Sequence, residues 1–149
     1  MELKQMIECS GISCSGIIVE LTESGYLEGT PAVRSVWNDM KQLRIQIALD
    51  DFGTGYSNLM NISNLEPDIV KLDRGFTLKA LSRSYEYQLM QYVIEMVHKL
   101  NQYVCVEGVE TKEDLEKIKA LGPDLIQGYY YSKPCSRDEF LKKFFGHSE

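Results

Sequence analysis

Short apolar runs alternate along this chain with longer segments in which apolar residues recur every three or four positions. The short runs are rich in β-branched residues and are bounded by polar or glycine-containing turns, which is typical of β-strands. They cover residues 16–21, 44–50, 67–73, 103–108 and 124–131. The longer segments have helical periodicity, as in the stripe of Leu89, Val93 and Val97. Strands that alternate with helices predict βαβ units and a parallel sheet.

Capping residues indicate where the expected helices begin. Thr30 followed by Pro31 has the pattern of a helix entry, and Ser136 with Glu139 has the pattern of a capping box. Helices are expected from the N-terminal apolar stripe to Gly11, from Thr30 to Leu43, from Ser84 to Asn101, from Thr111 to Gly122 and from Ser136 onward. Together with the strands, they predict about five strand–helix units.

Polar residues concentrate where the expected strands end. In parallel α/β folds the carboxyl ends of all strands open onto one face, where ligands and catalytic groups collect. The residues at or just past these ends are Glu20, Asp50, Asp51, Lys71, Asp73, Glu107 and Gln127. The sequence therefore predicts one site at this rim.

The composition of that rim indicates metal chemistry. Carboxylates with a single lysine are suited to hard divalent cations such as Mg²⁺ or Mn²⁺. Neighbouring side chains point to opposite faces of a regular strand, so Asp50 and Asp51 can share a site only if the strand ends there and Gly53 and Gly55 let the chain turn. Two cations would neutralise the adjacent acids and clamp a phosphoryl group. The residues alone thus predict a metal-dependent α/β enzyme acting on phosphate.

The overall charge and composition exclude several other classes. The chain has 149 residues, with 16 basic and 22 acidic side chains and a net charge of −6, which argues against a broad basic face for nucleic acid. No apolar run approaches the roughly 20 residues of a membrane span, and the N-terminus has no signal-peptide pattern, so we expect a cytoplasmic protein. Four cysteines without metal-site spacing predict reduced thiols. Cys105 is expected to be buried and His98 to lie on a helix surface.

Five motifs, in order along the chain, resemble one family. They are ELTES at 20–24, DDFGTGYSNL at 50–59, KLD at 71–73, EGVET at 107–111 and QGYYYSKP at 127–134. Together they resemble the EAL family of bacterial phosphodiesterases, which act on cyclic di-GMP. The resemblance implies a TIM-like (β/α) barrel and two-metal hydrolysis of one phosphodiester bond to give linear pGpG.

The resemblance also implies roles for individual residues. Glu20, Asp50 and Asp51 would be metal ligands. Lys71 would orient or help to activate the attacking water and steady the phosphate. Glu107 would hold metal-bound water or serve as the base.

Three further residues would support this chemistry by the same resemblance. Gln127 would line the site, and Asp73 would be a supporting member. Glu23 would brace the loop at residues 52–59, which in the family couples the metal site to dimerisation.

The chain departs from the family pattern at its beginning. The glutamate-alanine-leucine motif that names the family, and an upstream strand with an asparagine ligand, have no counterpart in it. Residues 1–149 therefore resemble the C-terminal part of one EAL domain: an incomplete TIM-like barrel of about five units, where a closed barrel needs roughly 200 residues or more.

An incomplete barrel is expected to affect both the association of the chain and its activity. Open strand edges predict self-association as a homodimer or larger assembly. The missing ligands predict weak metal binding and little or no hydrolysis by this chain alone. The family resemblance is also compatible with a sensory or cyclase domain upstream. Two alternatives remain: a degenerate module that binds cyclic di-GMP or a protein partner without hydrolysis, and an unrelated metal-dependent barrel enzyme, for example one that forms an enolate.

Overall fold

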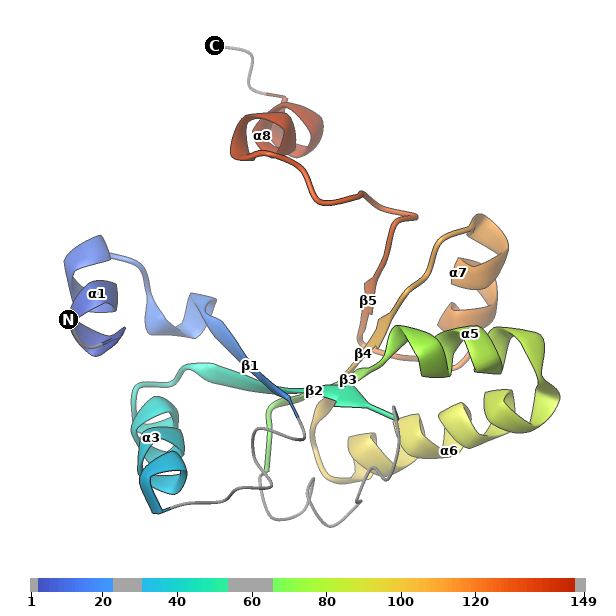
Figure 1. The fold of residues 1–149 in the computed structure, drawn as a ribbon, viewed down its shortest axis with the longest axis horizontal. Helices are drawn as coiled ribbons and strands as arrows, with labels where there is room; N and C mark the ends of the chain where they lie inside the picture. Colours follow the sequence, from blue (N-terminus) through green and yellow to red (C-terminus); the bar gives the residue numbers. More distant parts are fainter. Residues whose placement is uncertain (1–2, 23–30, 54–65, 147–149) are drawn as a thin grey trace.

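Five parallel strands form one curved sheet in which each strand pairs with the strand before it in sequence (Figure 1). This computed structural model describes residues 3–22, 31–53 and 66–146. The strands are β1 (Ile18–Thr22), β2 (Gln46–Phe52), β3 (Ile69–Leu72), β4 (Tyr103–Glu107) and β5 (Leu125–Gln127). Sequential parallel pairing is the strand order of a (β/α) barrel. The predicted α/β fold, an incomplete barrel with five parallel strands, is confirmed.

Helices connect the strands. They are α1 (Leu3–Ser10), the short 3-10 helix η1 (Cys14–Gly16), α3 (Pro31–Gln42), α5 (Arg74–Ser82), α6 (Ser84–Lys99), α7 (Lys112–Lys119) and α8 (Arg137–Phe145). The capping box expected at Ser136 is present, and Thr111, where a helix was expected to begin, has one with Asp114. The helix α5 was not predicted, because it has only a weak apolar stripe. Its clearest signal is Asp73, whose carboxylate accepts a hydrogen bond from the Gly75 N–H at 2.6 Å and caps the helix.

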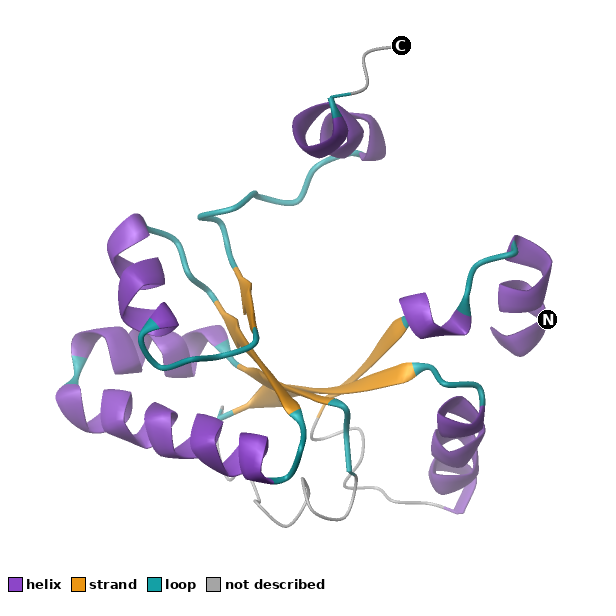
Figure 2. Cartoon of the chain, turned by 180° about the vertical axis from the view of Figure 1, so that it is seen from behind, coloured by secondary structure: helices purple, strands orange, loops and turns teal. Residues whose placement is uncertain are grey.

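The two faces of the sheet have different environments. Figures 1 and 2 show α3, α5, α6 and α7 along the outer side of the curved sheet, whereas α1 and α8 stand apart at its two ends. Outward strand residues such as Leu49, Val70 and Val104 are completely buried in the main core against these helices. Among the described residues, the buried apolar side chains of the inner face form a small separate cluster: Ala48, Ile69 and Cys105. The helix-covered face therefore stabilises the fold, and the concave face is left for the site.

The last predicted strand is shorter than expected. Residues 124–131 were expected to be extended, but β5 ends at Gln127 and the chain turns at Gly128. The Val109 N–H donates to the Gln127 carbonyl at 3.3 Å, and the Tyr130 N–H donates to the Val109 carbonyl at 3.0 Å. These bonds join the ends of β4 and β5 through a turn, so the strand prediction was wrong beyond Gln127.

Two aspartates secure the entries of β3 and β5 in the same way. Asp68 and Asp124 each follow a proline and precede a strand. A carboxylate oxygen of Asp68 accepts from the Ile47 N–H at 2.8 Å, and one of Asp124 accepts from the Val104 N–H, also at 2.8 Å. Each aspartate thus satisfies a backbone donor at the start of the neighbouring strand.

A side-chain nitrogen from the helix that precedes the neighbouring strand, α3 before β2 or α6 before β4, completes each of these anchors. Lys41 Nζ lies 3.1 Å from Asp68 Oδ1, and His98 Nε2 lies 2.8 Å from Asp124 Oδ2. His98 is on a helix surface, as predicted, but it has an acidic partner that its own sequence neighbourhood does not reveal. The two anchors repeat one arrangement at two places in the barrel.

Replacing Asp124 with alanine is expected to lower the free energy of unfolding by about 1–3 kcal/mol at pH 7, because a buried N–H of β4 loses its charged acceptor. Burial raises the pKa of Asp124, but hydrogen bonds from Val104 and His98 outweigh it and hold that pKa below its usual value. The contribution of Asp124 to stability is therefore present above its unfolded pKa and is lost as the pH falls through its lower folded pKa. Urea unfolding followed by far-ultraviolet circular dichroism at pH 7 and in acid measures both effects.

The control for this variant is Asp138→Ala, since Asp138 is highly exposed and only contacts Arg137 at 3.5 Å. It should change stability by no more than about 0.5 kcal/mol. Equal stability of the Asp124 variant and the control at pH 7 would contradict the anchoring role.

Candidate functional site

Lys71 lies at the centre of a cluster of carboxylates on the concave face. Its side chain is only 7% exposed, although it carries an ammonium group. The ammonium nitrogen lies 2.8 Å from Glu20 Oε2, 3.1 Å from Asp50 Oδ1 and 2.7 Å from Glu107 Oε1. Each of these four residues comes from a different strand, β1 to β4 in order. The structure thus brings together four residues that were predicted to share a site.

The charges of this cluster do not balance. Burial lowers the pKa of Lys71, but hydrogen bonds to Glu107, Glu20 and Asp50 outweigh it and raise the pKa above its ordinary value. The lysine is therefore charged at neutral pH, and one positive charge faces three carboxylates. The net negative charge that remains favours an additional cation.

A β-bulge explains how adjacent aspartates can share this edge of the sheet. Leu49 pairs with Val70 and Phe52 pairs with Leu72, so two residues of β2, Asp50 and Asp51, oppose a single residue of β3. Asp51 has a φ of 61°, in the left-handed region. The prediction that the strand ends at Asp50 was wrong, because the bulge lets β2 continue to the buried Phe52. The bulge, rather than the strand end, breaks the alternation of side chains.

The remaining predicted residues lie in three different settings. Gln127 on β5 pairs in register with Glu107 on β4 and extends the row of polar residues to the fifth strand. Asp73 is the cap of α5, so its observed contact is structural. Glu23 and the loop at residues 52–59 that it was expected to brace fall largely outside the described residues.

A cleft of about 420 Å³ adjoins the cluster, and sequence reasoning missed two of its residues. Arg74 and Glu110 line it together with Glu107, Gln127 and Tyr129. Arg74 Nη2 donates to Glu110 Oε1 at 2.7 Å, and Arg74 Nε donates to the same oxygen at 3.2 Å. No local signal indicates the pairing, because 36 residues separate the partners.

The donor set fits a hard divalent cation by its chemistry. Glu20, Asp50, Asp51 and Glu107 offer carboxylate oxygens, which Mg²⁺ and Mn²⁺ prefer. Within the described ranges, no three histidine, cysteine or acidic side chains are grouped so that they could hold a metal ion. Instead, the Lys71 ammonium lies among three of the acids. The residues present therefore fit the metal by type and by charge.

The family follows from comparison with known proteins. Residues 1–134 match the EAL domain family. The chain belongs to the EAL family. It is 30% identical over 146 residues to the cyclic di-GMP phosphodiesterase NbdA of Pseudomonas aeruginosa, a match that covers 96% of this chain and 19% of NbdA. The chain therefore spans about a fifth of the length of that relative.

Solved structures share the fold of this chain. The EAL domain of Mycobacterium smegmatis DcpA has a TM-score of 0.86 and 27% identity, over 95% of this chain and 64% of that chain. The complex of Klebsiella pneumoniae BlrP1 with manganese and cyclic di-GMP has a TM-score of 0.83 and 27% identity, over 89% of this chain and 34% of that chain. These likenesses confirm the EAL family and its fold.

No helix in the described part of this EAL chain is long and apolar enough to cross a membrane.

Proposed function

We propose that this chain supplies the carboxylate–lysine side of a metal-dependent site that hydrolyses cyclic di-GMP to linear pGpG. The observation that carries the proposal is the convergence of three carboxylates from three strands on the buried Lys71 ammonium. The EAL family match, a relative named as a cyclic di-GMP phosphodiesterase and a relative in complex with manganese and cyclic di-GMP support it.

Three acids are proposed to hold the metal. Glu20 and Asp50 already lie within hydrogen-bond distance of one cation, the Lys71 ammonium, and Asp51 follows Asp50 in the bulge. A bound Mg²⁺ or Mn²⁺ would polarise a phosphate oxygen and lower the pKa of water. Glu20, Asp50 and Asp51 would fix its position at the carboxyl ends of β1 and β2.

The other residues are proposed to act on the phosphate of the substrate and on the proton of the attacking water. Lys71, charged and held by its three acids, would donate a hydrogen bond to a phosphate oxygen. Glu107 would accept the proton of the attacking water, because its carboxylate ends the neighbouring strand. Gln127, opposite Glu107, would donate from its amide to the substrate. Asp73 supports them indirectly by fixing the start of α5 just after β3.

The setting of this site is part of the proposal. We infer a cytoplasmic location, a sensory or cyclase domain as a covalent neighbour, and self-association of the isolated chain through its open strand edges. Hydrolysis by the isolated chain is expected to be weak.

Replacing Asp50 with asparagine is expected to abolish manganese-dependent binding of cyclic di-GMP, because the substitution removes one negative charge from the acid cluster. Isothermal titration calorimetry of cyclic di-GMP, with and without Mn²⁺, measures the binding, and chromatography of long incubations detects pGpG. Binding that needs neither the metal nor Asp50 would contradict the proposed site. Metal-dependent binding without any pGpG would instead identify a non-catalytic module.

The matched control is Asp138→Asn on α8, an exposed acid distant in sequence from the cluster. It makes the same chemical change and should leave metal-dependent binding unchanged. Parallel circular dichroism spectra of both variants separate loss of the site from loss of the fold.

A further inference from the structure

An ion pair between Arg74 and Glu110 stands in the cleft beside the acid cluster. The guanidinium directs two of its nitrogens to one oxygen: Nη2 of Arg74 donates to Glu110 Oε1 at 2.7 Å, and Nε donates to the same oxygen at 3.2 Å. A guanidinium has five N–H donors, and a carboxylate has two acceptor oxygens. In the part of the chain that the structure describes, Nη1 of Arg74 and Oε2 of Glu110 therefore keep their hydrogen-bonding capacity. The pair offers a donor and an acceptor to a ligand in the cleft.

The backbone after β4 holds this pair in place. Gly108 follows Glu107 with a φ of 80°, and a Cβ added to it would overlap Arg74 Cγ and lie 2.8 Å from Arg74 Cβ. The stem of Arg74 thus packs directly on the Gly108 backbone, and the ion pair fixes its guanidinium. The side chains of Arg74 and Glu110 are nevertheless 57% and 39% exposed, so a ligand can reach them. Polar groups that are already positioned lose little conformational freedom on binding.

The cleft also has an aromatic ring. Tyr129, which is 55% exposed, lines it together with Gln127 and Glu107. Aromatic side chains stack on the planar rings of nucleobases. Glu107 belongs to the cleft and, through its contact with Lys71 Nζ at 2.7 Å, to the acid cluster. A nucleotide whose phosphate lies at Lys71 can therefore extend its base into the cleft.

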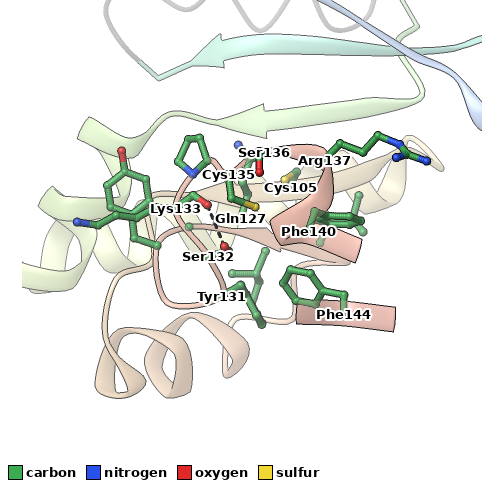
Figure 3. Close-up of a pocket in the computed structure, with 15 residues that line it drawn as sticks. Cys105, Gln127, Tyr131, Ser132, Lys133, Cys135, Ser136, Arg137, Phe140 and Phe144 are labelled. Carbon is green, nitrogen blue, oxygen red and sulfur yellow. Dashed lines mark hydrogen bonds between the residues drawn. The ribbon is translucent and has the colours of Figure 1, made fainter. Parts of the chain in front are cut away.

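A second cavity, of about 780 Å³, lies between β5 and α8 and has a different chemistry. Figure 3 shows the aromatic rings of Phe140 and Phe144 at its wall. Among the described residues that line it, none carries a carboxylate, and its charged groups are those of Lys133 and Arg137. Of the two cavities, only the smaller cleft thus offers a charged acceptor to a base that has N–H donors.

We propose that Arg74 and Glu110 recognise the guanine base of the substrate. Guanine presents an acceptor, O6, next to two donors, N1–H and the 2-amino group. Arg74 Nη1 donates to O6, Glu110 accepts from the two donors, and the purine ring lies on Tyr129. Adenine would place an amino group against the guanidinium and has neither the N1 hydrogen nor the 2-amino group, so the pair disfavours it. This guanine specificity rests on the proposed function, which names cyclic di-GMP as the substrate, and it assigns the choice of base to these two residues.

Three mononucleotides test this selection, because GMP, IMP and AMP share the same ribose phosphate and differ only in the base. IMP lacks the 2-amino group of guanine but keeps N1–H and O6. Chemical-shift titration by nuclear magnetic resonance, in EDTA, measures weak affinities and removes any contribution from a metal. We expect GMP to bind about tenfold more tightly than AMP, with IMP between them, because AMP loses the charge-assisted hydrogen bonds to the pair.

Two substitutions in the pair should remove this preference. Glu110→Gln removes the charged acceptor, and Arg74→Lys keeps the positive charge but replaces the planar fork with a single ammonium. Each should reduce the preference for GMP over AMP to less than about twofold. Arg83 and Glu86 form a control pair of the same residue types, with Arg83 Nη1 at 3.1 Å from Glu86 Oε1, and neither lines the cleft. Arg83→Lys and Glu86→Gln should leave the preference unchanged.

The aromatic ring has a different expected effect. Tyr129→Leu should weaken the binding of all three mononucleotides about tenfold, because stacking does not depend on the edge of the base. Melting curves by circular dichroism confirm that each variant is folded.

No detectable binding of GMP, equal binding of GMP and AMP, or a preference that survives either Glu110→Gln or Arg74→Lys would overturn the proposal. These results differ from failure of the proposed function, which would appear as binding of cyclic di-GMP that needs neither Mn²⁺ nor Asp50. The mononucleotide titrations contain no metal, so the two failures are measured separately.

Discussion

Replacing Lys71 with methionine is expected to lower the free energy of unfolding by about 2–3 kcal/mol at pH 7, because three partly exposed carboxylates would lose the cation that they share. This loss of unfolding free energy should be larger than the loss caused by replacing any exposed lysine. Urea unfolding at low ionic strength measures it. Under the proposed function, any metal-dependent binding of cyclic di-GMP should be lost as well, since the same ammonium is proposed to contact the phosphate.

The loss should be reversed by anything that restores neutrality to the cluster. Mn²⁺ should raise the melting temperature of the methionine variant more than that of the wild-type chain. In the wild-type chain the pKa of Lys71 is raised. The contribution of Lys71 to the free energy of unfolding is therefore complete at pH 7 and is lost only as the pH rises through the folded pKa.

Lys79→Met on the exposed surface of α5 is the matched control, and Lys71→Arg tests whether a different cation can restore the cluster. Lys79→Met should change stability by less than about 0.5 kcal/mol. A similar loss in both methionine variants, or a loss that Mn²⁺ does not reverse, would show that Lys71 acts by packing rather than by charge.

The parts of the molecule that depend on local pattern were predictable from the sequence. Predicted runs of six to eight residues indicated all five strands, and capping pairs such as Ser136 with Glu139 indicated helix entries. The site could be predicted because parallel strands present their ends together, whatever helices lie between them. Hence Glu20, Lys71 and Glu107 could be assigned to one rim before any contact was known.

The parts that depend on register and on distant partners were not predictable. Asp73 was assigned to the site because of its motif, but its carboxylate caps a helix whose own apolar pattern is weak. The pairing of Arg74 with Glu110 depends on how the ends of β3 and β4 align, and neither segment shows this alone. A bulge at Asp51 likewise exists only relative to the neighbouring strand.

Replacing Gly128 with alanine, in the turn after β5, is the second substitution for which we expect a large loss of stability. A Cβ at this position would overlap the carbonyl oxygen of Val109 and lie 2.5 Å from its nitrogen. The turn would have to open, which would strain the two hydrogen bonds that join Val109 to Gln127 and Tyr130. We expect a loss of about 3 kcal/mol in the free energy of unfolding, the upper part of the usual range for overpacking.

Gly16→Ala is the control for that experiment, because no atom lies within 4 Å of its added Cβ and its φ is not in the left-handed region. The same methyl group should therefore cost less than about 0.5 kcal/mol at Gly16. Because Val109 is two residues from Glu107, opening the turn should also weaken metal-dependent binding of cyclic di-GMP in the Gly128 variant. Unfolding curves and calorimetry on both variants measure the two effects, and a Gly128 variant as stable as the Gly16 variant would contradict the close approach of the two backbones.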